Sequence, residues 1–244
     1  MKDNRLVRAL SMVVFAVGLL AGTTLIAITV WGDLEATLFN PGIRYDANLR
    51  GLQCPVLITP KQTGTIRARI KNTLDRSTNL FIRARTSEGY VTLIREEQTQ
   101  LALDPGEAQW VEWTISADDA AFERLVLFKV AVTGGHPLPA RQGTCGIVRI
   151  NTTILTGGQL YALGLIVSLV CCIGATILWI RSNPRMLGTR VQLTRAMIWL
   201  SANIVTGIVV SFLGWWVAGT VSLVVILLTL GVTIGYLAGS SPQQ

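Results

Sequence analysis

Residues 9–31 read ALSMVVFAVGLLAGTTLIAITVW and contain no Asp, Glu, Lys, Arg or His. Three later stretches are also free of charged residues and histidine, and they cover residues 159–180, 196–217 and 220–238. A helix rises about 1.5 Å per residue, so each stretch is long enough to cross a hydrocarbon core of ~30 Å. The sequence therefore predicts four transmembrane helices, with residues 32–158 inserted between the first and the second.

The basic residues next to these stretches predict the orientation of the chain. They are Lys2, Arg5 and Arg8 before the first stretch, and Arg181, Arg185, Arg190 and Arg195 between the second and the third. Because Lys and Arg are enriched in cytoplasmic loops, residues 1–8 and 181–195 are expected in the cytoplasm, and the four crossings then return residues 239–244 to the same side. Residues 32–158 are then periplasmic or extracellular, and the membrane is the plasma (inner) membrane.

The first apolar stretch has two interpretations. It is longer than the ~7–15-residue core of a cleaved signal peptide, and no convincing small-x-small cleavage site follows before Trp31. A retained signal anchor is therefore favoured over a cleaved signal peptide.

The formal net charge of +7 does not indicate a nucleic-acid partner. Residues 32–158 hold fourteen basic and thirteen acidic residues, so the surplus lies almost wholly beside the apolar stretches. We expect the arginines of the loop 181–195 to face anionic lipid instead. Membrane lipids are thus an expected partner.

The inserted segment has the pattern of short strands. In residues 65–71, Ile66, Ala68 and Ile70 alternate with basic residues, which is the two-residue period of a half-buried strand. Further candidate strands are residues 56–59, 80–85, 90–94, 99–103, 109–115, 125–133 and 146–150. This number and spacing predict an all-β antiparallel sandwich.

Two groups of motifs carry a resemblance to a known family. They are Ile66-x-Ala68-x-Ile70-x-Asn72 with Leu80-x-Ile82, and Leu101-Ala102-Leu103-Asp104-Pro105-Gly106-Glu107 with Trp113-Thr114-Ile115. Both resemble patterns of immunoglobulin-like domains in bacterial envelope proteins. The resemblance covers about residues 56–150 and implies a β-sandwich, but that architecture supports many functions. The four-helix chain as a whole resembles no family.

Two of the four cysteines flank the candidate strands. Cys54 precedes the first and Cys145 precedes the last, so a disulfide between them would join the two ends of the domain. The alternative is two independent buried thiols. Cys171 and Cys172 lie within the second apolar stretch and are expected to be packing residues.

His136, the single histidine, lies in a Gly/Pro turn with no second ligand nearby, so no metal site is expected.

No catalytic group or cofactor site is expected. A nucleophilic mechanism would depend on His136, and no nucleophile can be assigned to it. The acidic pairs Glu96-Glu97 and Asp118-Asp119 are typical of a solvated strand edge, with a glycosidase-like carboxylate pair as the alternative. No phosphate-binding or dinucleotide-binding glycine motif occurs.

Small residues recur at a spacing of four in every apolar stretch, which places each set along one helix face. The sets are Gly18 and Gly22; Gly164, Ser168 and Cys172; Asn203, Gly207 and Ser211; and Gly231, Gly235 and Gly239. They predict helix packing, either inside a four-helix bundle or against another membrane protein.

Together these features predict a non-catalytic membrane accessory or scaffolding subunit that presents a β-sandwich for protein binding or complex assembly. Its expected partner is another membrane protein or a second copy of the chain. One alternative is a ligand-sensing receptor, although the segments assigned to the cytoplasm are too short for an output domain. Another is a cell-envelope enzyme that uses ectodomain carboxylates.

Overall fold

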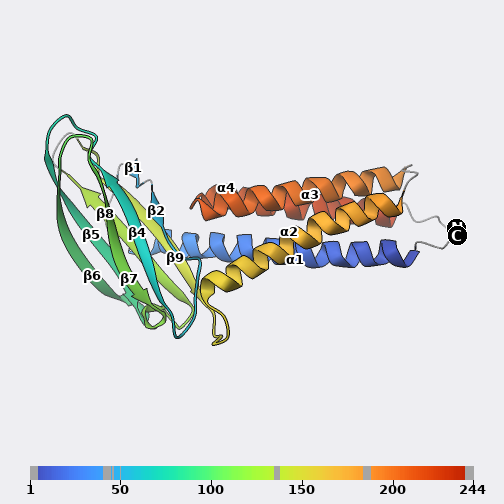
Figure 1. Ribbon diagram of the computed structural model, residues 1–244, viewed down its shortest axis with the longest axis horizontal. Coiled ribbons are helices and arrows are strands. Elements are labelled where there is room, and N and C mark those ends of the chain that lie inside the picture. Colours follow the sequence, from blue (N-terminus) through green and yellow to red (C-terminus); the bar gives the residue numbers. More distant parts are fainter. Residues whose placement is uncertain are drawn as a thin grey trace. The chain divides into compact units, whose positions relative to one another are not determined.

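A computed structural model describes residues 5–40, 45, 47–49, 51–134, 138–183 and 188–239. The chain divides into two compact units, one formed by residues 1–30 and 161–244 and the other by residues 31–160 (Figure 1). The helix α1 (Arg5–Leu38) belongs to both units, because it is continuous past Val30.

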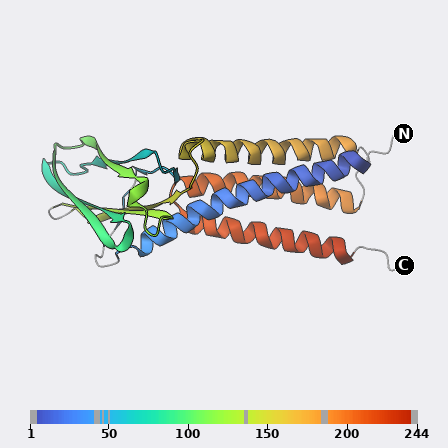
Figure 2. The ribbon, with the colours of Figure 1, turned by 90° about the horizontal axis from the view of Figure 1, so that it is seen from below.

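The first unit is helical. It contains most of α1 together with α2 (Gly157–Ser182), α3 (Thr189–Phe212) and α4 (Trp216–Gly239), whose ribbons are shown in Figure 2. All four helices are long and apolar enough to cross a membrane. The break between α3 and α4 falls at residues 213–215, where Gly214 adopts a φ of 75°. A positive φ is readily adopted by glycine, which explains why the chain turns there.

The second unit contains two β-sheets. The larger one has the strand order β1-β9-β8-β5-β6, with β3 also paired to β9, and the smaller one has the order β2-β4-β7. The strands are β1 (Ala47–Asn48), β2 (Leu52–Gln53), β3 (Leu57–Ile58), β4 (Thr63–Lys71), β5 (Thr78–Glu88), β6 (Tyr90–Leu103), β7 (Ala108–Ser116), β8 (Leu125–Thr133) and β9 (Arg141–Arg149).

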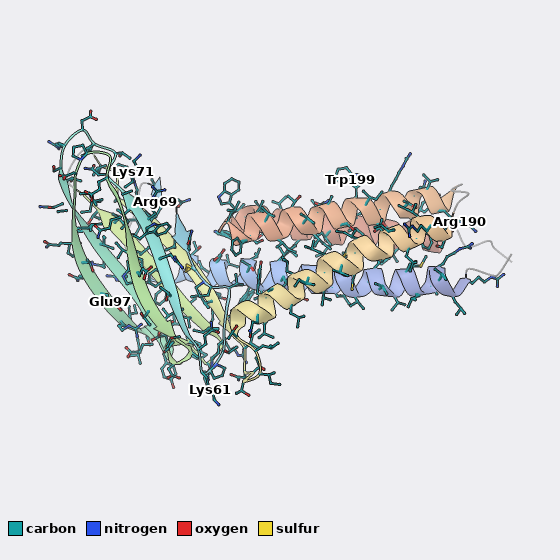
Figure 3. All side chains as sticks on the ribbon, viewed as in Figure 1. Lys61, Arg69, Lys71, Glu97, Arg190 and Trp199 are labelled. Carbon is teal, nitrogen blue, oxygen red and sulfur yellow. A yellow bond between two sulfur atoms is a disulfide. The ribbon has the colours of Figure 1, made fainter. Side chains whose placement is uncertain are left out.

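The two sheets share one apolar core. The smaller sheet contributes Ile66, Ala68, Ile70, Trp113 and Ile115, and the larger contributes residues of β5, β8 and β9. In β4 these buried residues alternate with exposed ones such as Arg69 and Lys71 (Figure 3), as the two-residue period predicted.

The larger sheet is mixed, and the prediction of an antiparallel domain was wrong for one edge. β1 and β3 both pair in parallel with β9. Between them, β2 pairs with β4 of the other sheet. The segment from Ala47 to Ile58 therefore runs in the direction of β9 and crosses between the sheets, which the pattern of side chains does not reveal.

The end of α1 packs on the larger sheet. Ala36 and Phe39 are buried in a small cluster with Ala121 and Leu127. Upstream, Gly32 approaches Gly146 of β9 so closely that a Cβ on Gly32 would lie 2.8 Å from the Gly146 carbonyl oxygen. Residues 32–38 are thus a helical part of the β unit, and the first helix extends beyond the apolar stretch that ended at Trp31.

Candidate interaction surface

The strand β6 forms one edge of the larger sheet. It pairs with β5 only, among the strands that the structure describes. The side chains from Tyr90 to Gln100 are exposed or half-buried on both faces of this edge. A strand edge without a neighbour presents backbone N–H and C=O groups that a second strand could bind.

The sequence predicted two strands, residues 90–94 and 99–103, where the structure has one. The polar residues between them, Arg95–Gln98, continue the strand because they pair with residues 83–86 of β5. From Tyr90 to Gln100 neither face is buried, so the two-residue period is absent there, and it returns at the buried Leu101 and Leu103.

Apolar side chains gather at the start of β6. The β5–β6 register shifts after Ser87, and no β5 partner pairs with residues 91–93. Tyr90 and Leu93 are 58% and 53% exposed, and Phe122, which is 62% exposed, contacts Tyr90 edge to face with ring centroids 5.8 Å apart. Aromatic side chains of this kind are common anchors of protein interfaces. We call Tyr90, Val91, Leu93 and Phe122 the apolar corner.

The backbone at this corner is strained. Phe122 and Glu123 have φ values of 51° and 56°, and left-handed conformations are unfavourable for residues with a Cβ. The Phe122 N–H donates to the Gly89 carbonyl at 2.9 Å, which holds the loop against the β5–β6 turn. The fold therefore keeps an exposed aromatic ring in place at a cost in stability.

Three of the four carboxylates in the predicted acidic pairs, those of Glu96, Glu97 and Asp119, contact basic or backbone groups. Glu96 forms ion pairs with Arg85 at 2.8 Å and Arg83 at 3.2 Å. A hydrogen bond from Gln98, followed by that from Arg85, lowers the pKa of the Glu96 carboxyl. Asp119 accepts two bonds from Arg95, the shorter at 2.7 Å, and closes a capping box with Ser116. These contacts give Glu96 and Asp119 a structural role in the β unit.

Two buried ionisable groups hold the end of α1. Lys129 donates from Nζ to the Asn40 carbonyl at 3.1 Å, a favourable position for a cation after a helix C-terminus. Burial, together with the charge of Arg85, lowers the pKa of Lys129. Asp33 lies past Trp31, in the β unit; burial raises its pKa to about 6, opposed by a hydrogen bond from the Gly146 N–H.

The disulfide between Cys54 and Cys145 is present, as predicted. It links the segment between β2 and β3 to β9. The free cysteines among the described residues are Cys171 and Cys172, both on α2. Neither His136 nor Arg185 is among the described residues, and the described ones contain no cluster of three His, Cys, Asp or Glu residues that could hold a metal.

Three of the small-residue sets lie between helices of the first unit. Gly18 lies against Cys172, and Gly22 against Ser168 and Ile204. Gly164 lies against Leu25, and Gly207 against Ile26 and Ser222. Asn203 accepts a bond from Ser222 through its carbonyl at 3.1 Å. The backbones of α1, α2, α3 and α4 approach one another at these positions.

The fourth set is placed differently. A Cβ at Gly231 or Gly235 would meet no atom within 4 Å, so neither packs against the described part of this chain. The packing face of α4 is formed instead by Gly219, Ser222 and Ile226, which the spacing rule did not single out. Gly231 and Gly235 therefore have no internal packing contact among the described residues, and an external contact stays a prediction.

The arginines of the predicted loop fall at helix ends. Arg181 lies in the last turn of α2, and Arg190 and Arg195 lie in the first two turns of α3. All three are exposed, and Figure 3 labels Arg190 and the exposed Trp199 on the same helix. Their contact with lipid stays a prediction.

Comparisons with known proteins add no family. No family model matches the sequence, and no curated protein matches it. Among solved structures, a Bacteroides uniformis β-glucuronidase 2 is 15% identical with a TM-score of 0.32, over 40% of this chain and 12% of its own. A Paenibacillus cycloisomaltooligosaccharide glucanotransferase is 13% identical with a TM-score of 0.33, over 45% and 15%. The matched parts are a small share of those enzymes, and the likenesses are too low to support an argument.

The fold itself defines the class: four helices able to cross a membrane, and a β domain of two sheets.

Proposed function

We propose that this chain is a non-catalytic accessory or scaffolding subunit of a membrane complex. A signal anchor, α1, starts in the cytoplasm, and the β domain is an immunoglobulin-like sandwich presented in the periplasm or outside the cell. The C-terminus returns to the cytoplasm. The arginines beside the helices and the continuous α1 support this orientation.

The observation that carries the proposal is the edge strand β6 with its apolar corner. An exposed aromatic pair beside a free strand edge offers a partner both an apolar anchor and backbone hydrogen bonds. The end of α1 packs on β9, which belongs to the same sheet as β6. This contact would fix the last turns of α1 relative to the sheet that carries the surface.

The test is purification of the intact chain in mild detergent, with the mass of the native complex as readout. Phe122→Asn removes the aromatic ring, while asparagine tolerates the left-handed backbone. We expect about thirtyfold weaker assembly, the loss typical of an interface anchor. Ile154→Asn, at a position that is 88% exposed outside the corner, is the matched control. A chain that purifies alone, or an unaffected complex in Phe122→Asn, contradicts the proposal.

A ligand-sensing receptor is the second candidate. It is favoured by the continuity of α1 between the two units, because a shift of the sheet would move the helix. A small molecule that raises the melting temperature of the intact chain, and changes labelling of cysteines introduced along α1, would favour sensing over scaffolding.

A further inference from the structure

We propose that β6 pairs with β6 of a second copy of this chain, in antiparallel orientation and centred on Glu96. This inference rests on the proposed function and identifies the partner at the β6 edge. The edge of β6 that has no neighbour among the described strands supplies the backbone groups, and the sequence of the strand selects the register.

Symmetry restricts the possible registers. Two copies related by a two-fold axis perpendicular to the sheet keep every side chain on its own face. Opposed residues must therefore lie at equal distances from a residue at the centre. With Glu96 at the centre, Arg95 lies opposite Glu97 of the second copy, and Glu97 lies opposite Arg95.

Charge complementarity favours this centre. Opposite charges directly across a strand pair attract, and the two-fold symmetry forms the Arg95–Glu97 pair twice. A centre at Gln98 would place Arg95 opposite Leu101, and a centre at Glu97 would place two Glu97 carboxylates together. Only the Glu96 centre, among these three, pairs unlike charges.

The local contacts are compatible with such a pairing. Arg95 is already held by Asp119 and lies 3.4 Å from Glu97 of its own chain, so both side chains are ordered near the edge. Figure 3 shows Glu97 at the outer edge of the β unit. The two Glu96 carboxylates would also face each other, and each is accompanied by Arg83 and Arg85, which offset their repulsion.

The test is disulfide cross-linking of the full chain in its membrane. Glu96→Cys places the two introduced thiols opposite each other, so oxidation should give a covalent dimer on a non-reducing gel. Gln98→Cys is the matched control on the same face of the same strand. Its two thiols would be about 14 Å apart, beyond the reach of a disulfide. The unsubstituted chain controls for Cys171 and Cys172.

A second variant tests the charge pairs. Glu97→Arg would set two arginines opposite Arg95 side chains and should weaken dimerisation about tenfold, whereas the melting temperature of the chain should change little. Failure of Glu96→Cys to cross-link, or equal cross-linking by Gln98→Cys, overturns the inference. If the intact chain still purifies with a different protein in that case, the proposed scaffolding function stands without the second copy.

Discussion

The backbones of Gly32 in α1 and Gly146 in β9 touch, and neither residue has space for a side chain. A Cβ on Gly146 would overlap the Gly32 carbonyl group. The contact joins a helix that begins as an apolar span to the strand that carries Cys145. It places Gly32 directly against the larger sheet, just past the end of the apolar stretch.

Gly146→Ala should therefore destabilise the β unit. The added methyl group must separate α1 from β9, and overpacking of this kind costs about 1–3 kcal/mol or more. We expect a lower melting temperature of the detergent-solubilised chain, measured by differential scanning fluorimetry. Gly158→Ala, where a Cβ would meet nothing within 4 Å, is the control. Equal melting of the two variants would mean that the helix and strand separate without cost.

Asp33 should make stability depend on pH. Its pKa is raised from 3.8 to about 6, so the folded state favours the neutral carboxyl. The stabilisation is complete below pH 3.8 and is lost as the pH rises through about 6; the shift corresponds to about 3 kcal/mol at most. Asp33→Asn, which resembles the neutral form, should flatten the melting temperature between pH 5 and pH 7. Glu35→Gln, which removes an equal charge from the same helix, is the control.

Reduction of the Cys54–Cys145 disulfide should lower stability strongly. The two residues are separated by 91 positions. In the chain-entropy model, a disulfide that closes a loop of that length stabilises the folded state by ~4–5 kcal/mol. The measurement is the melting temperature of the intact chain with and without reductant, with the Cys54→Ser/Cys145→Ser variant as the control that reductant should not affect. A fragment limited to residues 49–153 would be unsuitable, because it lacks Ala36 and Phe39.

Orientation can be measured with an impermeant thiol reagent on intact cells. Ser77→Cys, in an exposed turn of the β unit, should react, and Gln192→Cys, exposed near the start of α3, should not. Ser116 and Ser182 are poor reporters, since Ser116 caps the short helix η1 (Ala117–Asp119) and Ser182 is buried. Labelling of Gln192→Cys without Ser77→Cys would invert the proposed topology.

The sequence predicted the parts of the fold that depend on local pattern. Three features could be read from the order of residues alone: the four apolar stretches, the alternation in β4, and the pairing of the two cysteines that flank the candidate strands. The docking of residues 32–38 was missed because it depends on a strand more than a hundred residues away. Phe122 was missed because nothing in its sequence marks a left-handed residue that exposes an aromatic ring.

The small residues show the same limit. Spacing identified a face of each helix, but it could not determine which face meets a neighbour. In α3 the predicted face, with Gly207 and Ser211, does contact other helices. In α4 the packed face carries Gly219, Ser222 and Ile226, with Leu230 against the same apolar cluster, so Gly231 and Gly235 lie on a different face of the helix.

Substitutions at Gly231 and Gly235 should separate internal from external packing. Because both positions face open space, Gly231→Leu and Gly235→Leu should leave the melting temperature of the isolated chain unchanged. Gly22→Leu should lower it, since a Cβ there would already lie 2.6 Å from Ile204. If this part of α4 docks against another membrane protein, each of the two α4 variants should shift the native complex to smaller size in mild detergent, whereas Leu228→Ala should do so less. An unchanged complex in both variants would leave these glycines as lipid-facing positions with no part in assembly.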